Sequence, residues 1–351
     1  MRIAGRQIGA GNPVYVVAEI SANHNQKFEY ASRLVHAAKE AGADAVKLQT
    51  YTPETITIPC DSSHFQIAGG TLWGGRSLYE LYKEASMPWE WQPKLKAIAD
   101  ELDITLFSSA FDPTAVDFLE RMDVPAHKVA SCELVDIPLI EKMARTGKPL
   151  ILSTGMATLD EINEAMEAAR EAGGRDVLLL KCTSAYPGQP EDMNLRTIPE
   201  MSRLFGVPVG LSDHTLGVSV PVAAVTLGAC MVEKHLTLSR ELAGPDSAFS
   251  VEPHEFAEMV ESVRTAERAL GKIQFGPARS EETSRAFRRS LFVVRDINAG
   301  ERFTPDNVKS IRPASGLHTR YLSHVLGQRA SQDIRRGTPL SWSLIAMEAA
   351  A

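Results

Sequence analysis

The sequence has few cysteines, none of them at metal-binding spacing. Cys60, Cys132, Cys182 and Cys230 occur singly in the 351-residue chain, and three of them lie in or beside expected strands. CxxC pairs, which are typical of zinc sites, are absent. We therefore expect reduced thiols in the core of a cytoplasmic protein and no cysteine-based metal site.

Long apolar runs and dense basic runs are also missing. No segment approaches the roughly 20 apolar residues needed to cross a bilayer, and residues 1–13 lack the apolar core of a signal peptide. The net charge of −7 makes nucleic acid an unfavourable partner. With 44% hydrophobic residues, the chain is long enough for one large domain plus a small one.

Short apolar runs alternate with amphipathic segments from residue 14 to residue 270. The expected strands are 14–20, 45–51, 105–111, 127–131, 149–155, 177–183, 207–213 and 231–237, and the expected helices include 30–41, 137–146, 158–172, 196–205, 216–229 and 255–270. Eight such units in about 260 residues predict an α/β protein with a closed (β/α)8 TIM barrel. The alternative is an open doubly wound sheet, but no GxGxxG follows the first strand.

Two regions depart from this alternation. Residues 52–92 form a long, Trp-rich excursion with a short helix in its middle, and such excursions are often functional. After residue 275 the composition becomes polar, which indicates a linker over 276–290 and a small domain over 291–351. Within the small domain we expect a short helix capped by Thr304.

Polar side chains follow the end of every expected barrel strand, where a barrel carries its active site. His214 and His235 end neighbouring strands and suit a divalent metal ion. Lysines with nearby hydroxyl groups suit the phosphate and carboxylate of one small ligand, and the carboxylates Glu19 and Glu133 suit proton transfer. Each residue alone has a structural explanation as a strand-edge hydrogen bond, but a full ring of them favours metal-assisted chemistry on an anionic small molecule.

Eight motifs in order resemble the sialic acid synthase family over nearly the whole chain. They include AEISANHNQ, KVASCE, KCTSAYPGQPEDMNL, GLSDHTLG, EKHLTL and GPDSAFSVEP, and the last 60 residues resemble the antifreeze-like (SAF) domain of that family. The resemblance implies an enzyme, a transferase that condenses phosphoenolpyruvate with an N-acetylated amino sugar and releases phosphate. Several segments look most like the members that use 2,4-diacetamido-2,4,6-trideoxy-L-altrose and make pseudaminic acid.

The resemblance also implies roles for particular residues. His214 and His235 would hold the metal, most often Mn²⁺, with Mg²⁺ or Co²⁺ as alternatives, and Glu19 would be catalytic beside it. Substrate-binding positions would be Lys47, Ser109, Lys128, Ser131, Glu133, Ser153, Ser184, Tyr186, Ser212, Asp246 and Arg312. Arg312 would reach the active site of a partner subunit, which implies a domain-swapped homodimer.

The resemblance leaves alternatives for the sugar. Ser184 stands where N-acetylneuraminate synthases carry Asn, and Ser247, Ala248 and Phe249 follow the GPD motif. These departures weaken an assignment to N-acetylmannosamine, and Phe249 with the Trp-rich excursion suits a sugar that ends in a methyl group. Neuraminate or legionaminate synthesis and a non-catalytic sugar- or ice-binding protein are the competing hypotheses.

Overall fold

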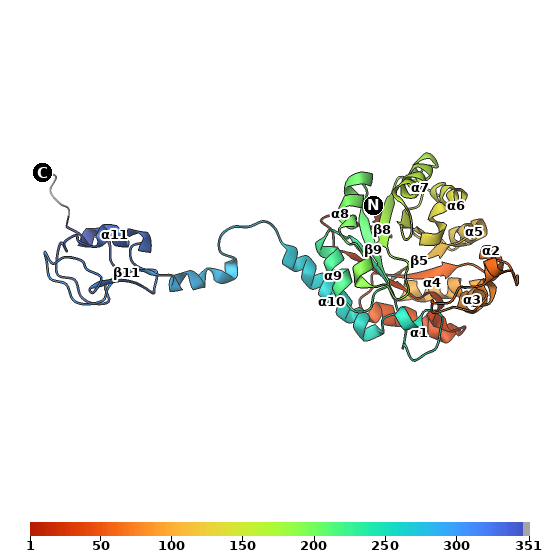
Figure 1. Cartoon of the computed structure of the whole chain (residues 1–351), viewed down its shortest axis with the longest axis horizontal. Coiled ribbons are helices and arrows are strands. Elements are labelled where there is room, and N and C mark those ends of the chain that lie inside the picture. Colours follow the sequence, from red (N-terminus) through yellow and green to blue (C-terminus); the bar gives the residue numbers. More distant parts are fainter. Residues whose placement is uncertain (347–351) are drawn as a thin grey trace. The chain divides into compact units, whose positions relative to one another are not determined.

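A computed structural model describes residues 1–346 as two compact units, the first ending at Gly271 and the second beginning at Lys272 (Figure 1). Residues 347–351, which belong to the predicted small domain, lie outside the described residues. Among residues 1–346, no helix has the length and the apolar composition needed to cross a membrane.

The first unit is built on a closed barrel of eight parallel strands, as predicted. The strands are β3 (Tyr15–Glu19), β4 (Ala45–Thr50), β5 (Thr105–Ala110), β6 (His127–Val129), β7 (Leu150–Ser153), β8 (Val177–Cys182), β9 (Val209–Asp213) and β10 (Met231–His235). The barrel closes because β10 pairs with both β9 and β3. A short hairpin of β1 (Arg2–Ile3) and β2 (Arg6–Gln7), which the sequence did not predict, precedes it.

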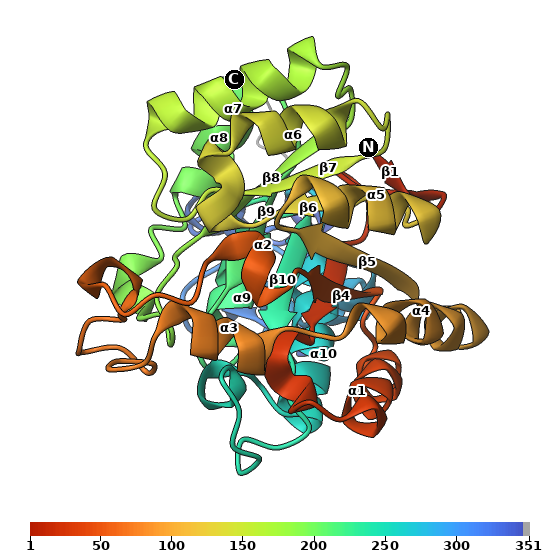
Figure 2. The same cartoon turned by 90° about the vertical axis from the view of Figure 1, so that its right-hand side faces the viewer.

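A helix follows each barrel strand and covers its outer face (Figure 2). These helices are α1 (Phe28–Glu40), α4 (Gln92–Glu101), α5 (Pro113–Arg121), α6 (Ile137–Ala144), α7 (Leu159–Glu171), α8 (Thr197–Phe205), α9 (Ser219–Thr226) and α10 (Pro253–Leu270). Asp112 caps α5, and the capping box of Thr158 and Glu161 begins α7. Helix α4 was not predicted, because the Trp-rich excursion obscured its start.

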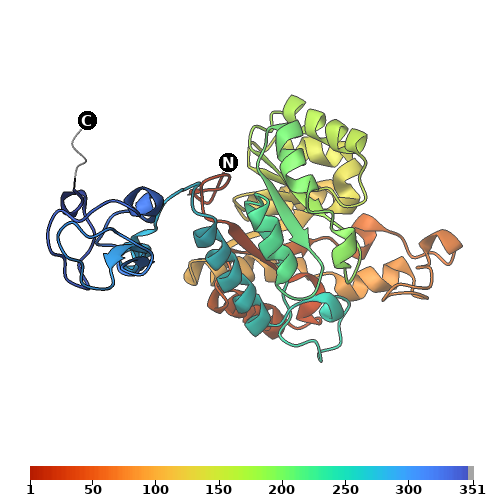
Figure 3. The ribbon, with the colours of Figure 1, turned by 60° about the vertical axis from the view of Figure 1, so that its left-hand side comes forward.

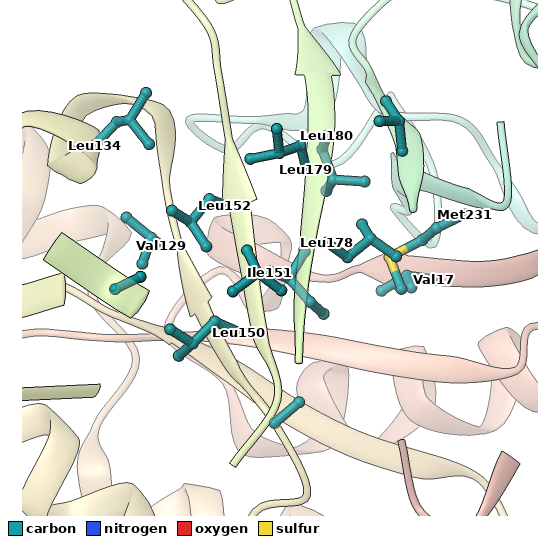
Figure 4. Packing of buried hydrophobic residues seen from close by; sticks show 14 of the residues in the cluster. Val17, Val129, Leu134, Leu150, Ile151, Leu152, Leu178, Leu179, Leu180 and Met231 are labelled. Atoms are coloured by element: carbon teal, nitrogen blue, oxygen red, sulfur yellow. The ribbon is translucent and has the colours of Figure 1, made fainter. Parts of the chain in front are cut away.

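The strands read as continuous apolar runs because both of their faces are buried. Figure 4 shows Leu150, Ile151 and Leu152 of β7 packed beside Leu178, Leu179 and Leu180 of β8. The packing is tight at one glycine: a Cβ on Gly210 of β9 would lie 2.6 Å from the Met231 carbonyl oxygen. An alanine there would push β9 and β10 apart.

The excursion between β4 and α4 contains α2 (Pro53–Ile56), the 3₁₀ turn η2 (Ser63–Phe65), α3 (Leu78–Ala85) and the 3₁₀ turn η3 (Trp89–Trp91). Ser77 begins α3 by accepting a hydrogen bond from the Glu80 amide at 3.2 Å. In Figure 2, α2 and α3 lie in front of the barrel strands, and Figure 3 shows the same orange segment projecting beyond them. The predicted excursion therefore covers one end of the barrel.

The second unit contains an antiparallel pair, β11 (Ser290–Val293) and β12 (Val308–Ile311), the short helix α11 (Leu322–Val325) and its own apolar cluster. The prediction of a Thr304-capped helix was wrong, because residues 304–307 form a turn. The Asn307 side chain accepts from the Thr304 amide at 2.7 Å and donates to the Arg302 carbonyl at 3.0 Å. These side-chain bonds to the backbone compete with helix formation.

Candidate active site

Lys47 of β4 lies at the centre of a buried charged cluster inside the barrel. Its Nζ is 2.5 Å from Glu19 Oε2 and 3.3 Å from Glu233 Oε1, and it donates to Ser109 Oγ at 3.0 Å. Ser212 donates to the same Glu233 oxygen at 3.2 Å. Because all five side chains come from neighbouring strands and are buried, the sheet fixes their positions.

Lys128 of β6 forms a second buried cation beside this cluster. Its Nζ donates to Ser153 Oγ at 2.7 Å and to the Val129 carbonyl at 2.9 Å. Burial is the main cause that lowers the pKa of Lys128, to about 8. An ammonium group without a carboxylate partner in a dry site gains energy when an anion binds next to it.

Gly155, two residues after the end of β7, lets two hydroxyl groups approach the backbone. A Cβ at this position would lie 2.2 Å from Ser184 Oγ and 2.6 Å from Ser131 Oγ. The Gly155 amide donates to Ser131 Oγ at 3.2 Å. The structure thus brings Ser131 and Ser184 together at the end of the barrel.

His214 and His235 meet at the carboxyl ends of β9 and β10. The register pairs Asp213 with Lys234, so the next residues on the two strands are the two histidines. Their ring centroids are 5.3 Å apart. Burial and the neighbouring His214 lower the pKa of His235 well below its usual value, which keeps this imidazole neutral.

Hydrogen bonds fix which ring nitrogen of each histidine is free. His214 Nδ1 is 3.0 Å from the Thr183 carbonyl oxygen, which can only accept. Ser21 Oγ donates to Asp246 Oδ2 at 2.5 Å, so its lone pair accepts from His235 Nδ1 at 3.0 Å. Both Nδ1 atoms therefore carry a proton, so Nε2 is the atom of each ring that would bind a metal ion.

This arrangement fits a divalent metal ion with two protein ligands. Metal-binding histidines commonly donate their second ring N–H to a carbonyl or to a carboxylate-linked group, as His214 and His235 do. Within residues 1–346, three or more His, Cys, Asp or Glu side chains do not gather at a metal-binding spacing. The other ligand positions would consequently be filled by water and substrate oxygens.

A cavity of about 620 Å³ opens beside the histidines at this end of the barrel. Five predicted site residues line it: Ser131, Glu133, Tyr186, His235 and Asp246. Ser184 lies next to it, and Lys47, Lys128, Ser109, Ser153, Ser212 and Glu19 lie deeper in the barrel. The predicted residues therefore form a deep charged group and an outer group around the cavity.

Burial raises the pKa of three carboxyl groups at the site, Glu19, Glu133 and Asp246. Burial raises the pKa of Glu133 to about 7, and its Oε2 atom has no hydrogen-bond partner. Burial also raises the pKa of Glu19 to about 7, although Lys47 opposes the shift. Groups with such pKa values suit proton transfer near neutral pH.

Two site residues were missed by the sequence reading. Glu233 was placed at a strand end without a role, yet it contacts Lys47 and Ser212. Its inward position follows from its register with Ser212, a signal that was available in the sequence. Ser21, in contrast, acts through its contacts with Asp246 and His235, which are more than 200 residues away and leave no local pattern.

One cysteine differs from the prediction of core thiols. All four cysteines are free, and Cys182 and Cys230 are buried as expected. Cys132 is exposed and lines the cavity, because it lies in the 3₁₀ turn after β6 and not in the strand. Arg312 belongs to the second unit, where it is exposed on the segment after β12.

Comparison with known proteins shows which family has these features. A model of the NeuB family matches residues 34–275, and a model of the SAF domain matches residues 288–346. The chain belongs to the NeuB family. The resemblance drawn from the motifs is thereby confirmed, and so is the combination of a TIM barrel with a C-terminal SAF domain.

Individual relatives match along almost the full chain. A pseudaminic acid synthase of Helicobacter pylori is 47% identical, over 94% of this chain and 97% of that protein. An N,N'-diacetyllegionaminic acid synthase of Legionella pneumophila is 35% identical, over 96% of both chains. The crystal structure of an N-acetylneuraminic acid synthetase from Leptospira borgpetersenii is similar with a TM-score of 0.71 and 31% identity, over 81% of this chain and 94% of that one.

Proposed function

We propose that the protein is a pseudaminic acid synthase, which condenses phosphoenolpyruvate with 2,4-diacetamido-2,4,6-trideoxy-L-altrose. The observation that carries the reaction type is the buried Lys47 and Lys128 cluster facing two imidazoles with free Nε2 atoms. The choice of sugar rests on the 47% identity to the Helicobacter pylori enzyme, compared with 35% to the legionaminic acid enzyme.

The deep group of residues would bind phosphoenolpyruvate. Lys128 supplies a cation without a carboxylate partner, and Ser109, Ser153 and Ser212 supply hydroxyl donors. Lys47 is neutralised by Glu19 and Glu233 before the substrate enters. An incoming phosphate or carboxylate competes with these carboxylates for Lys47, so the Lys47 ammonium group can turn to the bound anion while Glu19 remains a carboxylate.

The outer group of residues would place the aldehyde of the sugar next to phosphoenolpyruvate. His214 and His235 would hold a divalent metal ion, Mn²⁺ by the family resemblance, and when bound this ion would polarise the aldehyde carbonyl. Asp246, Glu133, Tyr186 and Ser184 lie where the rest of the sugar would bind.

The reaction then needs two bond formations and one bond cleavage. C3 of phosphoenolpyruvate attacks the aldehyde carbon, and a water molecule adds to C2. The resulting tetrahedral centre expels inorganic phosphate and leaves the 2-keto acid. Glu19, whose pKa lies near 7 and which ends β3 beside Lys47, is placed to hold the proton that the attacking water loses.

Phosphate release tests this assignment. The purified protein is incubated with Mn²⁺, phosphoenolpyruvate and one of three sugars: the L-altrose derivative, its manno isomer 2,4-diacetamido-2,4,6-trideoxymannose, or N-acetylmannosamine. We expect the largest kcat/KM with the L-altrose derivative, and a product whose mass is that of a nine-carbon 2-keto acid. Activity with N-acetylmannosamine alone would contradict the proposal, and sugar binding without turnover would favour a binding protein.

We further propose a homodimer in which the second unit, including Arg312, serves the partner's site. The segment that joins the units carries Ile273 and Phe275, two large apolar side chains that would give a partner subunit apolar contacts. Sedimentation should therefore report a dimer, and Arg312→Ala should weaken sugar use more than phosphoenolpyruvate binding. A monomer with full activity would contradict this arrangement.

A further inference from the structure

The outer half of the cavity has a different chemistry from the half beside the histidines. The half that contains His235 also holds the polar residues Ser131, Glu133 and Asp246, together with the aromatic Phe249. On the side of the excursion most of the lining is apolar and comes from α2, α3 and the loop between them: Ile56, Ile67, Leu78, Leu81 and Ala85, with the hydroxyl-bearing Thr71 and Tyr82 among them. A molecule that fills the whole cavity therefore needs a polar end and an apolar end.

Aromatic side chains join the excursion to the site. Trp73 donates from Nε1 to the Pro245 carbonyl at 2.9 Å, which ties the excursion to the loop that carries Asp246. The Trp73 ring lies 5.5 Å from the Tyr186 ring and 6.3 Å from the Phe249 ring, and Phe249 lies 4.9 Å from His235. One continuous aromatic wall thus runs from a proposed metal ligand to the apolar excursion.

We propose that the apolar half of the cavity is a subsite for the C4–C6 end of the sugar and selects for its 4-acetamido and 6-methyl groups. This inference rests on the proposed function, because it assumes that the aldehyde carbon sits beside His214 and His235. The sugar tail then points away from the histidines toward Ile67 and Leu78. N-acetylmannosamine carries hydroxyl groups at C4 and C6, whereas in the diacetamido sugars C4 carries an acetamido group, which ends in a methyl, and C6 is itself a methyl group.

The physical limits of an apolar subsite set the size of its effect. Such a pocket rejects an added hydroxyl group by a factor of about 100 at most, because the hydroxyl loses solvation but meets no steric barrier. The excursion should therefore discriminate against N-acetylmannosamine moderately. The L-altrose derivative and its manno isomer carry the same tail substituents, so the subsite should favour both over N-acetylmannosamine, and the deeper polar residues must distinguish their stereochemistry.

Polar substitutions in the excursion test the subsite. Ile67→Asn and Leu78→Asn each place an amide in the apolar half, and using two positions guards against a folding defect in one of them. The matched control is Ile58→Asn, on the same excursion but 54% exposed and outside the cavity. For each full-length variant, kcat/KM is measured for all three sugars, together with KM for phosphoenolpyruvate.

We expect both cavity variants to lower the preference for either diacetamido sugar over N-acetylmannosamine by about 10-fold. The control should keep the wild-type preference, and KM for phosphoenolpyruvate should stay unchanged in all three variants. Unchanged preferences in both cavity variants would overturn the subsite even if the L-altrose derivative is the substrate. Activity with the manno isomer in place of the L-altrose derivative would overturn the proposed function and leave the subsite intact.

Discussion

The deep charged group and the apolar excursion are built in opposite ways. The deep group consists of buried charged and hydroxyl side chains that lie on barrel strands. The excursion consists of apolar side chains on short helices and loops, and several of them are half-exposed. Strands hold reacting groups in fixed positions, which suits a reaction step that all members of a family share. A loop can change its side chains without disturbing the barrel, which suits the choice of substrate.

Loss of a proposed metal ligand should give the largest effect. We expect His235→Ala to reduce turnover by about 10³-fold or more with every sugar, because the aldehyde loses its electrophilic activation. Mn²⁺ binding, followed by calorimetry, should fall in parallel, while circular dichroism should show a folded barrel. His36→Ala, on the exposed face of α1, is the matched control. Wild-type rates in His235→Ala would refute the metal assignment.

A smaller loss of metal affinity should follow from removing the Ser21 hydroxyl group, which orients His235. Ser21→Ala removes the link between Asp246 and His235 Nδ1, so the ring can turn and lose its fixed tautomer. Metal affinity should drop by about 10- to 100-fold, as is usual for groups that support a ligand. Ser62→Ala, at an exposed position, should bind metal normally. Unchanged affinity in Ser21→Ala would mean that the contact is only structural.

Glu133 lies at the boundary between the two regions and should make stability depend on pH. Its folded-state pKa is raised by burial from 4.5 to about 7. The folded protein therefore holds a proton that the unfolded chain releases, and stability falls as the pH rises from about 4.5 through 7. Glu133→Gln should be more stable than the wild type by about 3 kcal/mol at pH 8, and this advantage should vanish near pH 4.

Thermal unfolding at several pH values measures this difference, with the exposed Glu29→Gln as the control. A constant offset between Glu133→Gln and the wild type across the pH range would contradict the buried carboxyl account.

The smallest effect should come from the tie between the excursion and the barrel loop. Trp73→Phe keeps an aromatic ring against Tyr186 and Phe249 but loses the hydrogen bond to Pro245. One such bond contributes about 1 kcal/mol, or roughly 5-fold in kcat/KM for the sugar. The KM for phosphoenolpyruvate should not change, and a change there would show that the excursion also acts on the deep group.

The sequence predicted the structure best where the residues of a single strand or helix determine that element. The period of the apolar runs gave all eight strands, and Asp112 and Thr158 marked the starts of α5 and α7. It was least informative where distant segments meet. The bond between Ser21 and Asp246 joins residues 225 positions apart, and the turn at Thr304 depends on the side chain of Asn307. Helix α4 was hidden because its first residues belong to a Trp-rich stretch.

One kinetic comparison tests most directly whether the deep charged group binds phosphoenolpyruvate while the apolar excursion selects the sugar. Ser153→Ala removes the hydroxyl group that accepts a hydrogen bond from Lys128, whereas Ile67→Asn places an amide in the apolar half of the cavity. In both variants, KM for phosphoenolpyruvate is measured beside the preference for the L-altrose derivative over N-acetylmannosamine. Ser153→Ala should raise KM for phosphoenolpyruvate and keep the sugar preference. Ile67→Asn should keep KM for phosphoenolpyruvate and lower the sugar preference. If both quantities changed together in either variant, the two regions would not act separately, and the account would be wrong.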